Sequence, residues 1–323
     1  MYVDDLLVTG DDKDRIQKFK MEMQKQFEMS DLGIMHYFLG MEIMQKDTGI
    51  LMSQSKYAKD LLKKWKMKDC KPVSAPMACN EKLSKNDTGE KVNATMFRSI
   101  IGGLLFLTHT RPDIMFSVSY LSRFMHEPCE KHLRCAKRIL KYVKGTAKYG
   151  LWFSSKCSGE LMGFSDSDWA GNEDDSKSTS GYVFTLGNGV FSWCSKKQEV
   201  VAQSSAEAEY VAAVSAANQA IWIQKILSDL GINVSSPMVI NVDNKSAISL
   251  VENPVLHGIS KHIRVKFHVI REMVANEEIK LNYCPSEAQV ADVLTKSLQK
   301  AKFEHMRNML GVHETIPKEE NVN

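Results

Sequence analysis

The chain has 323 residues, of which 43% are hydrophobic and 25% are charged, and its formal net charge is +3. This length exceeds the usual size of one domain and supplies enough apolar side chains for two hydrophobic cores. The small net charge excludes a uniformly basic surface of the kind that coats some nucleic-acid-binding proteins.

Cysteine usage and hydropathy indicate the setting of the protein. The seven cysteines form no Cys-x-x-Cys pair and no regular framework, which is typical of reduced thiols in the cytoplasm or nucleus. No signal peptide is visible, and the most apolar run, residues 100–107, is too short to span a bilayer. We therefore expect a soluble cytoplasmic or nuclear protein that makes no contact with a membrane.

The first half of the chain is expected to divide at about residue 50, and residues 51–153 are predicted to be mainly helical. Basic side chains cluster at two places in this stretch, residues 63–68 and 137–144. Such clusters bind a nucleic acid backbone in a salt-dependent way. The solvated face of an amphipathic helix explains them equally well.

The second half begins after a polar, turn-rich linker at residues 154–159. Three strands near 161–167, 181–186 and 189–194 are predicted to form an antiparallel meander with a turn at Gly187-Asn188-Gly189.

The elements after the meander alternate between helices and strands. We expect a helix from about residue 206 to about residue 230, a strand at 238–242, two helices, a last strand and a last helix. With the meander they predict a mixed α/β fold with a five-stranded sheet within residues 158–312. The polar tail, residues 313–323, is expected to be disordered.

Four acidic residues stand at special places in this half. Asp166 and Asp243 close apolar strand segments, and open α/β sheets bind ligands at such strand ends. Glu209 lies in the predicted first turn of the long helix, and Asp292 lies in the predicted last helix. Each alone is more often a surface carboxylate than a ligand. Four together could hold two Mg²⁺ ions about 4 Å apart, an arrangement that clamps both reacting oxygens of a phosphodiester.

Two neighbouring acids are expected to have structural roles. Asp168 lies two residues from Asp166 and is expected to shape the turn, with a supporting role at the site left open. Glu207 follows Ser204 by three residues, which predicts a capping box that leaves Glu209 free to face the site.

The sequence around the four acids resembles that of the ribonuclease H domain of copia-like LTR retrotransposons. The matching segments are SDSDWAG at 165–171, SSAEAEY at 204–210, VDNKSAI at 242–248 and ADVLTKSL at 291–298.

This resemblance implies a ribonuclease H-like fold that holds two Mg²⁺ or Mn²⁺ ions. Asp166 and Asp243 would be shared or primary ligands, and Glu209 and Asp292 would complete the two metal positions. A metal-activated water would cleave the RNA strand of an RNA/DNA hybrid and leave a 3′-hydroxyl. The other implied partners are the nucleic acid backbone and the remaining Pol polyprotein. We expect residues 158–312 to fold and cleave hybrid without the N-terminal part.

The start of the chain carries a second resemblance. Tyr2-Val3-Asp4-Asp5 resembles the YxDD hairpin of a reverse transcriptase palm, and segments within 29–43 and 98–114 resemble the copia-type polymerase and its connection. This implies a truncated palm remnant at residues 1–50 and a thumb and connection at 51–153. The other polymerase aspartate and the fingers have no counterpart in this sequence. Asp4 and Asp5 are therefore expected to be a relic metal site that supports no autonomous DNA synthesis.

Two polar groups are predicted to contact the substrate. The first group, at the start of the long helix, is placed to bind phosphate or the RNA 2′-hydroxyl. The second could add contacts, although an ordinary polar turn explains it equally well. The residues are Gln203, Ser204 and Ser205 in the first group and Ser178, Thr179 and Ser180 in the second.

Two other interpretations remain open, and one further expectation concerns turnover. The chain could be a catalytically silent nucleic-acid-binding remnant of a decayed open reading frame. His257, His262 and His268 with Cys284 could suggest zinc, but they lack a standard ligand spacing. The loop 284–289 has no histidine, although many ribonucleases H carry one there, so we expect modest turnover and a shift toward Mn²⁺.

Overall fold

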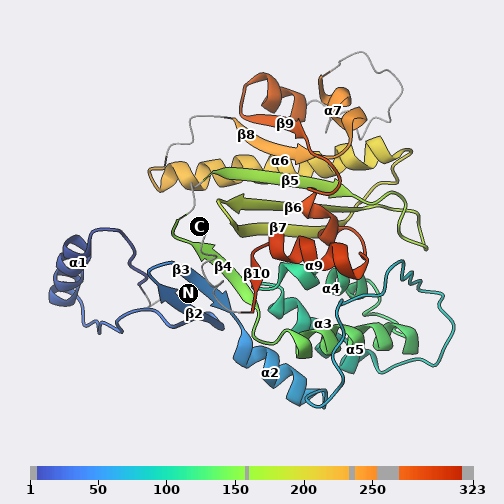
Figure 1. The fold of residues 1–323 in the computed structure, drawn as a ribbon, viewed down its shortest axis with the longest axis horizontal. Coiled ribbons are helices and arrows are strands. Elements are labelled where there is room, and N and C mark those ends of the chain that lie inside the picture. The colour runs from blue at the N-terminus through green and yellow to red at the C-terminus, as the bar shows by residue number, and fades with distance from the viewer. Residues whose placement is uncertain (1–5, 157–159, 233–236, 253–268, 315–323) are drawn as a thin grey trace, which may run out of the picture.

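Two five-stranded β-sheets organise the chain (Figure 1). The computed structural model describes residues 6–156, 160–232, 237–252 and 269–314. Within these ranges, no helix is both long and apolar enough to cross a membrane.

The second sheet along the chain has the strand order β7-β6-β5-β8-β9 and confirms the predicted mixed α/β fold. Its strands are β5 (Leu161–Ser167), β6 (Thr179–Leu186), β7 (Gly189–Lys197), β8 (Met238–Val242) and β9 (Ile279–Tyr283). Strands β5, β6 and β7 pair in antiparallel fashion, whereas β8 lies parallel to both β5 and β9. The meander turns at Gly187, whose φ of 61° suits glycine, as the sequence predicts. This is the strand arrangement of a ribonuclease H-like sheet.

Helix α6 (Ser205–Asp229) packs against β5 and β6 of this sheet (Figure 1). It begins at the N-cap residue Ser204, as predicted. Alanines at positions 208, 212, 216 and 220 recur at four-residue spacing and are fully buried. Because residues four apart share one helix face, these short side chains let the helix lie close to the strands. Helix α7 (Lys245–Glu252) follows β8, and residues 269–275 are helical before β9.

The first sheet is antiparallel and has the order β1-β2-β3-β4-β10. Its strands are β1 (Tyr37–Phe38), β2 (Met41–Lys46), β3 (Gly49–Ser53), β4 (Gly150–Ser154) and β10 (Val312–His313). Strand β10 pairs with β4, with His313 opposite Gly150. The first residue of the predicted tail is therefore ordered in a strand, and residues 315–323 lie outside the described part.

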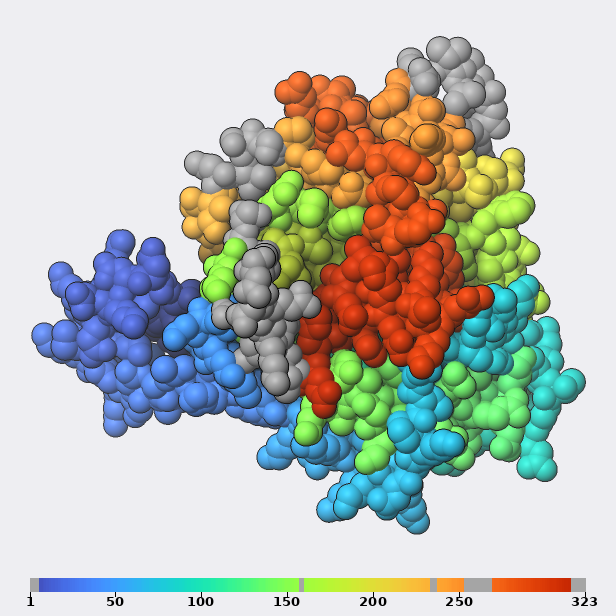
Figure 2. Space-filling model, viewed as in Figure 1, coloured from blue at the N-terminus to red at the C-terminus, as the bar shows by residue number. Residues whose placement is uncertain are grey.

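Helices make up most of the chain between β3 and β4. They are α2 (Ser55–Lys64), α3 (Ala94–Leu107), the 3-10 turn η1 (Pro112–Ile114), α4 (Met115–Ser122) and α5 (Glu130–Gly145). Helix α1 (Lys13–Gln26) precedes the first sheet and stands away from the rest of the molecule (Figure 2), with none of its residues buried.

A hydrophobic core crosses the predicted boundary between the two halves. The 3-10 helix η2 (Val290–Leu294) and helix α9 (Lys300–Met309) follow β9. Leu294 and Phe303, from these elements, lie in one buried cluster with Val118 of α4. The C-terminal elements therefore pack on the helices of the first half.

Polar and aromatic contacts reinforce this junction. The ring centroids of Tyr142 on α5 and Phe303 on α9 lie 5.5 Å apart. Arg307 donates a hydrogen bond to the Tyr142 hydroxyl at 3.3 Å. These contacts argue against the prediction that residues 158–312 fold alone, because that fragment would lose the surface on which α9 packs. The division into a palm remnant, a thumb and connection, and a ribonuclease H domain stays a prediction.

Candidate metal centre

Three of the four predicted acids meet at one end of the second sheet. Ligand oxygens of Asp166, Asp243 and Asp292 all lie within 4.8 Å of one another. Asp166 belongs to β5 and Asp243 directly follows β8, and these strands run parallel with Ser165 opposite Val242. Parallel neighbours end at the same edge, so the two side chains are brought together by the sheet itself. Asp166 and Asp292 are each only 1% exposed, whereas Asp243 is half-buried.

Asp292 reaches this edge from an element that differs from the predicted one. Residues Val290–Leu294 form the 3-10 helix η2, and the expected longer helix is absent there. Gln289 caps η2 by accepting the Ala291 N–H at 3.3 Å, and its amide donates to the Ser165 carbonyl at 2.9 Å. The buried Gln289 side chain thus fixes the position of η2 relative to β5.

Glu209 faces the same site from helix α6. It lies in the second helical turn, since α6 starts at Ser205, and this corrects the first-turn prediction. One carboxylate oxygen, Oε1, accepts the Ser167 N–H at 3.2 Å. The other, Oε2, is buried and has no hydrogen-bond partner among the described residues. A buried carboxylate oxygen without a partner is costly, and a bound cation would satisfy it.

Burial and the close approach of these acids raise the pKa values of two of them, Glu209 and Asp166. Burial, together with the carboxylates of Asp166 and Asp243, raises the pKa of Glu209 well above its usual range. Burial likewise raises the pKa of Asp166. The set of oxygen ligands, their low exposure and their mutual repulsion fit hard divalent cations such as Mg²⁺.

Two lysines and two hydroxyls surround the acids. Lys296 Nζ lies 2.8 Å from Asp292 Oδ1 and 3.5 Å from Asp166 Oδ2, and Lys302 Nζ contacts Asp292 Oδ2. The Thr295 hydroxyl donates to Asp166 Oδ2. Although burial opposes it, the carboxylates of Asp166 and Asp292 raise the pKa of Lys296, so this side chain is a cation.

The hydroxyl of Ser286 donates to Asp243 Oδ2 at 3.1 Å. Ser286 belongs to the loop 284–289, which has no histidine, and its contact with Asp243 shows that this loop reaches the site. Reasoning from the sequence missed Ser286, Thr295, Lys296 and Lys302. The only available signal was the four-residue spacing of Asp292 and Lys296 and their place in the ADVLTKSL segment.

Asp168 shapes the turn after β5, as predicted. Its carboxylate accepts the Thr179 N–H, and its own N–H donates to the Thr179 carbonyl at 3.2 Å. Burial raises the pKa of Asp168 to about 6. It does not belong to the group of three acids whose oxygens converge.

The predicted capping box of Ser204 and Glu207 is confirmed in one of its two hydrogen bonds. The Glu207 N–H donates to Ser204 Oγ at 3.2 Å, but the Glu207 carboxylate accepts from the Gln203 N–H at 2.7 Å. The side chain thus reaches one residue beyond the N-cap. It remains engaged at the helix start, while Glu209 turns to the acids.

The two predicted substrate groups differ in exposure. Gln203, Ser204 and Ser205 are exposed at the start of α6. The hydroxyls of Ser178, Thr179 and Ser180 are used inside the protein: they accept hydrogen bonds from Ala170 N, Arg123 Nη2 and Gln198 Nε2 respectively. These three residues are at most 7% exposed, so the structure offers no support for their contact with substrate.

Several predicted residues lie outside the described part of the chain. They are Asp4 and Asp5, predicted to be a relic polymerase site, and His257, His262 and His268 of the zinc alternative. Cys284 is buried and accepts a hydrogen bond from Gln289 Nε2 at 3.5 Å.

Sequence relatives place the chain in a family. The Retrovirus-related Pol polyprotein from transposon RE1 of Arabidopsis thaliana is 40% identical over 317 residues, which are 98% of this chain and 22% of the relative. That from transposon TNT 1-94 of Nicotiana tabacum is 39% identical over 322 residues, or 97% of this chain and 24% of the relative. A transposon Ty5-1 protein of Saccharomyces cerevisiae is 35% identical over 216 residues, 66% of this chain and 70% of the relative. The chain belongs to the copia-type retrotransposon Pol family.

A family model for reverse transcriptase (RNA-dependent DNA polymerase) matches residues 1–79 of this Pol chain. The chain spans less than a quarter of the length of the two plant polyproteins.

Two solved structures are similar to parts of the Pol chain. LC11-RNase H1 in complex with RNA/DNA hybrid is 16% identical, with 42% of this chain and 94% of that chain covered and a TM-score of 0.33. The foamy viral protease-reverse transcriptase in complex with dsDNA is 11% identical, with 84% and 51% covered and a TM-score of 0.44.

The protonation of the buried acids predicts how the stability of the metal-free Pol chain depends on pH. A carboxyl whose pKa is raised by folding stabilises the folded state fully below its unfolded pKa, and this contribution is lost as the pH rises through the folded pKa. For Asp168 this window runs from about pH 4 to about pH 6. In chelator, calorimetry should show a melting temperature that falls across this window. Asp168→Asn should flatten the decline, and an unchanged slope in this variant would contradict the assignment.

Proposed function

We propose that the second sheet of this Pol chain carries a ribonuclease H site that cleaves the RNA strand of RNA/DNA hybrids with two divalent cations. The observation that supports this most strongly is the convergence of Asp166, Asp243 and Asp292 within 4.8 Å. Glu209 adds a buried oxygen that lacks a protein partner. Such a set of oxygen ligands suits Mg²⁺ or Mn²⁺ and in-line displacement at phosphorus.

The side chains divide the work of this site. Asp166 and Asp243, on adjacent strand ends, would be the ligands common to both ions, and Glu209 and Asp292 would each complete one position. When bound, the ions would supply the charge that activates water and stabilises the leaving oxygen. Thr295 and Ser286 hold the carboxylates of Asp166 and Asp243 in place through hydrogen bonds. The burial of Asp166 keeps competing water from this carboxylate.

The substrate would approach along the exposed start of α6. Gln203, Ser204 and Ser205 are accessible there, and helix N-termini favour phosphate groups. Trp169, which is 57% exposed, lies beside them because its indole N–H donates to the Ala202 carbonyl at 3.3 Å. An exposed indole held in one orientation suits stacking against a sugar or base.

Strand and product analysis tests this proposal. The full chain is incubated with Mg²⁺ and a hybrid labelled on either the RNA or the DNA strand, with double-stranded DNA as control. We expect fragments of the RNA strand alone, carrying 3′-hydroxyl ends and absent in chelator. Cleavage of the DNA strand, or cleavage that persists in chelator, would refute a ribonuclease H activity.

A second candidate function has one observation in its favour. Lys296 and Lys302 already place two positive charges against the acids, as expected of a site that has lost its metals and only binds nucleic acid. This alternative predicts retention of hybrid on a gel without RNA fragments at any Mg²⁺ or Mn²⁺ concentration.

We further propose that residues 1–50 are a palm remnant, residues 51–153 a thumb and connection, and that the chain alone extends no primer. The reverse transcriptase family model matches residues 1–79 of this chain. Primer extension with labelled nucleotides on an RNA template should give no product. Template-directed extension that Asp4→Asn abolishes would overturn this prediction.

A further inference from the structure

Lys296 brings its ammonium group into the acid cluster from the segment just after η2, the short element that carries Asp292. It follows Asp292 by four residues and approaches two of the proposed ligands, at 2.8 Å from Asp292 Oδ1 and 3.5 Å from Asp166 Oδ2. Both oxygens belong to carboxylates that are nearly inaccessible. The ammonium therefore lies against oxygens that a divalent cation would use.

The charges explain why a cation belongs there in the metal-free protein. The three converging carboxylates of Asp166, Asp243 and Asp292 repel each other, the first two act on Glu209 as well, and burial makes an anion more costly. Lys296 supplies a positive charge to two of them at once, while Lys302 contacts only Asp292. Lys296 is thus the main internal counterion of the site.

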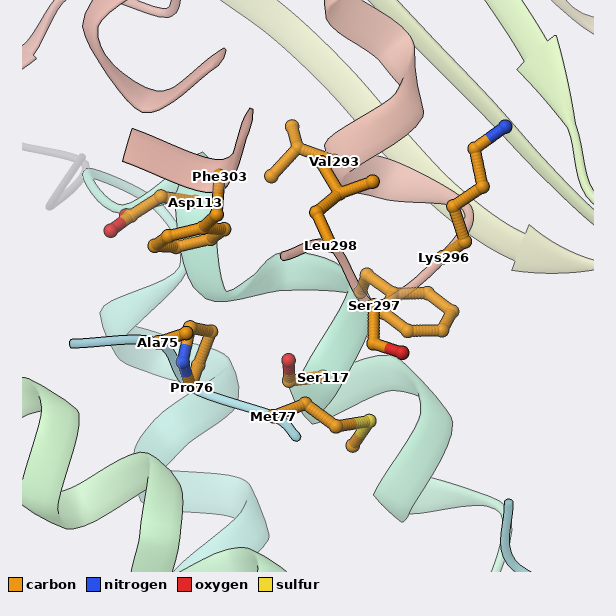
Figure 3. Close-up of a pocket in the computed structure, with 11 residues that line it drawn as sticks. Ala75, Pro76, Met77, Asp113, Ser117, Val293, Lys296, Ser297, Leu298 and Phe303 are labelled. Atoms are coloured by element: carbon orange, nitrogen blue, oxygen red, sulfur yellow. The ribbon is translucent and has the colours of Figure 1, made fainter. Parts of the chain in front are cut away.

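The Lys296 side chain has a route out of the site. It is 41% exposed, although its two carboxylate partners are 1% exposed. Lys296 is one of the residues that line a small cavity with Ala75, Pro76 and Met77, and Figure 3 shows its side chain pointing away from these three. That cavity has about 10 Å³ of space, roughly the room of one water, so the long side chain would leave toward solvent.

We propose that Lys296 is a tethered counterion that holds Asp166 and Asp292 in the metal-free protein and is displaced when a divalent cation binds. An ammonium and a divalent cation repel each other at these distances and draw on the lone pairs of the same two oxygens, so each weakens the binding of the other. Lys296 therefore lowers the metal affinity of the site and stabilises the protein without metal. This inference rests on the proposed function only in that the acids bind a divalent cation.

Metal binding to Lys296→Met tests the proposal without using activity. Titration calorimetry with MgCl₂ should give a dissociation constant about tenfold or more below that of the wild type, because one nearby positive charge is removed. In chelator, the variant should melt at a lower temperature than the wild type. Mg²⁺ should raise its melting temperature by more than it raises that of the wild type.

Lys300→Met is the matched control. Lys300 is exposed and makes no ion pair with any of the residues that the structure describes, so this variant removes the same charge a short distance from the site. It should leave both the dissociation constant and the metal-free melting temperature near those of the wild type. Equal effects of the two variants would overturn the proposal in favour of a general effect of net charge.

A labelling experiment on the wild-type chain gives a second test that does not depend on the folding of a variant. Lysines are acetylated briefly with and without MgCl₂, and the modified sites are quantified by mass spectrometry. We expect the reaction of Lys296 to accelerate several-fold with Mg²⁺, whereas that of Lys300 stays constant. An unchanged rate at Lys296, or Mg²⁺ affinity in Lys296→Met no higher than in the wild type, overturns the displacement. Displacement without any RNA cleavage would instead refute the nuclease and leave this inference intact.

Discussion

Glu209→Gln is expected to lower cleavage of an RNA/DNA hybrid by roughly a hundredfold or more, a loss of about 3 kcal/mol of barrier stabilisation. The Glu209 carboxylate is buried and keeps Oε2 free of any partner in the described part of the chain. An amide in its place removes the anionic charge that would hold a second ion near the reacting phosphate. The fold should survive, because the amide oxygen can still accept the Ser167 N–H.

Glu207→Gln is the matched control for this prediction. Its side chain accepts the Gln203 N–H at the helix start, and an amide oxygen can do the same. We expect a loss of stability well under about 1 kcal/mol and cleavage close to that of the wild type. Initial rates on a labelled hybrid, with melting temperatures measured in parallel, distinguish the two. If the two variants exchanged these phenotypes, Glu207 would be the ligand and the proposed role of Glu209 would be wrong.

The second large effect is expected when residues 158–314 are separated from the rest of the chain. The fragment exposes apolar side chains of η2 and α9, among them Leu294, Phe303 and Met306, which now pack on helices of the first half. Each large side chain left exposed forfeits about 1.5–3 kcal/mol. Several such losses approach a total stability of about 5–15 kcal/mol. We therefore expect this fragment to aggregate or to lack a cooperative melting transition.

Removal of residues 1–36 is the control for this fragment. Helix α1 in that segment has no buried residue, so its loss should shift the melting temperature by only about a few degrees. Both proteins can be compared by calorimetry and size-exclusion chromatography. A monomeric 158–314 fragment that melts cooperatively near the temperature of the full chain would show that the shared core contributes little.

The secondary structure around the site could be predicted because its signals are local. Asp166 and Asp243 follow short apolar segments that are typical of strands, and Ser204 marks the start of α6. The turn at Gly187 needs a positive φ, and a glycine at this position in the sequence indicates such a turn. Strand pairing then brings the two aspartates together without further information.

The missed features depend on contacts between distant segments. The sequence of α9 shows that the helix has an apolar face, but it does not show whether that face packs on the second half or on the first. The shared core could therefore not be predicted. Likewise, a hydroxyl such as that of Ser178 looks available in the sequence until Ala170 N–H is found donating to it. The position of Lys296 against Asp166 joins residues 130 apart in the chain, and only the folded structure shows it.

Cleavage of hybrid by the full chain with and without Asp243 tests the central claim most directly. Asp243 is half-buried and its carboxylate lies with those of Asp166 and Asp292, so Asp243→Asn removes a proposed ligand while leaving the buried core untouched. The wild type should release RNA fragments in Mg²⁺ or Mn²⁺ and none in chelator, and Asp243→Asn should be slower by roughly a hundredfold or more at an unchanged melting temperature. Equal cleavage by the wild type and a folded Asp243→Asn variant would contradict the account.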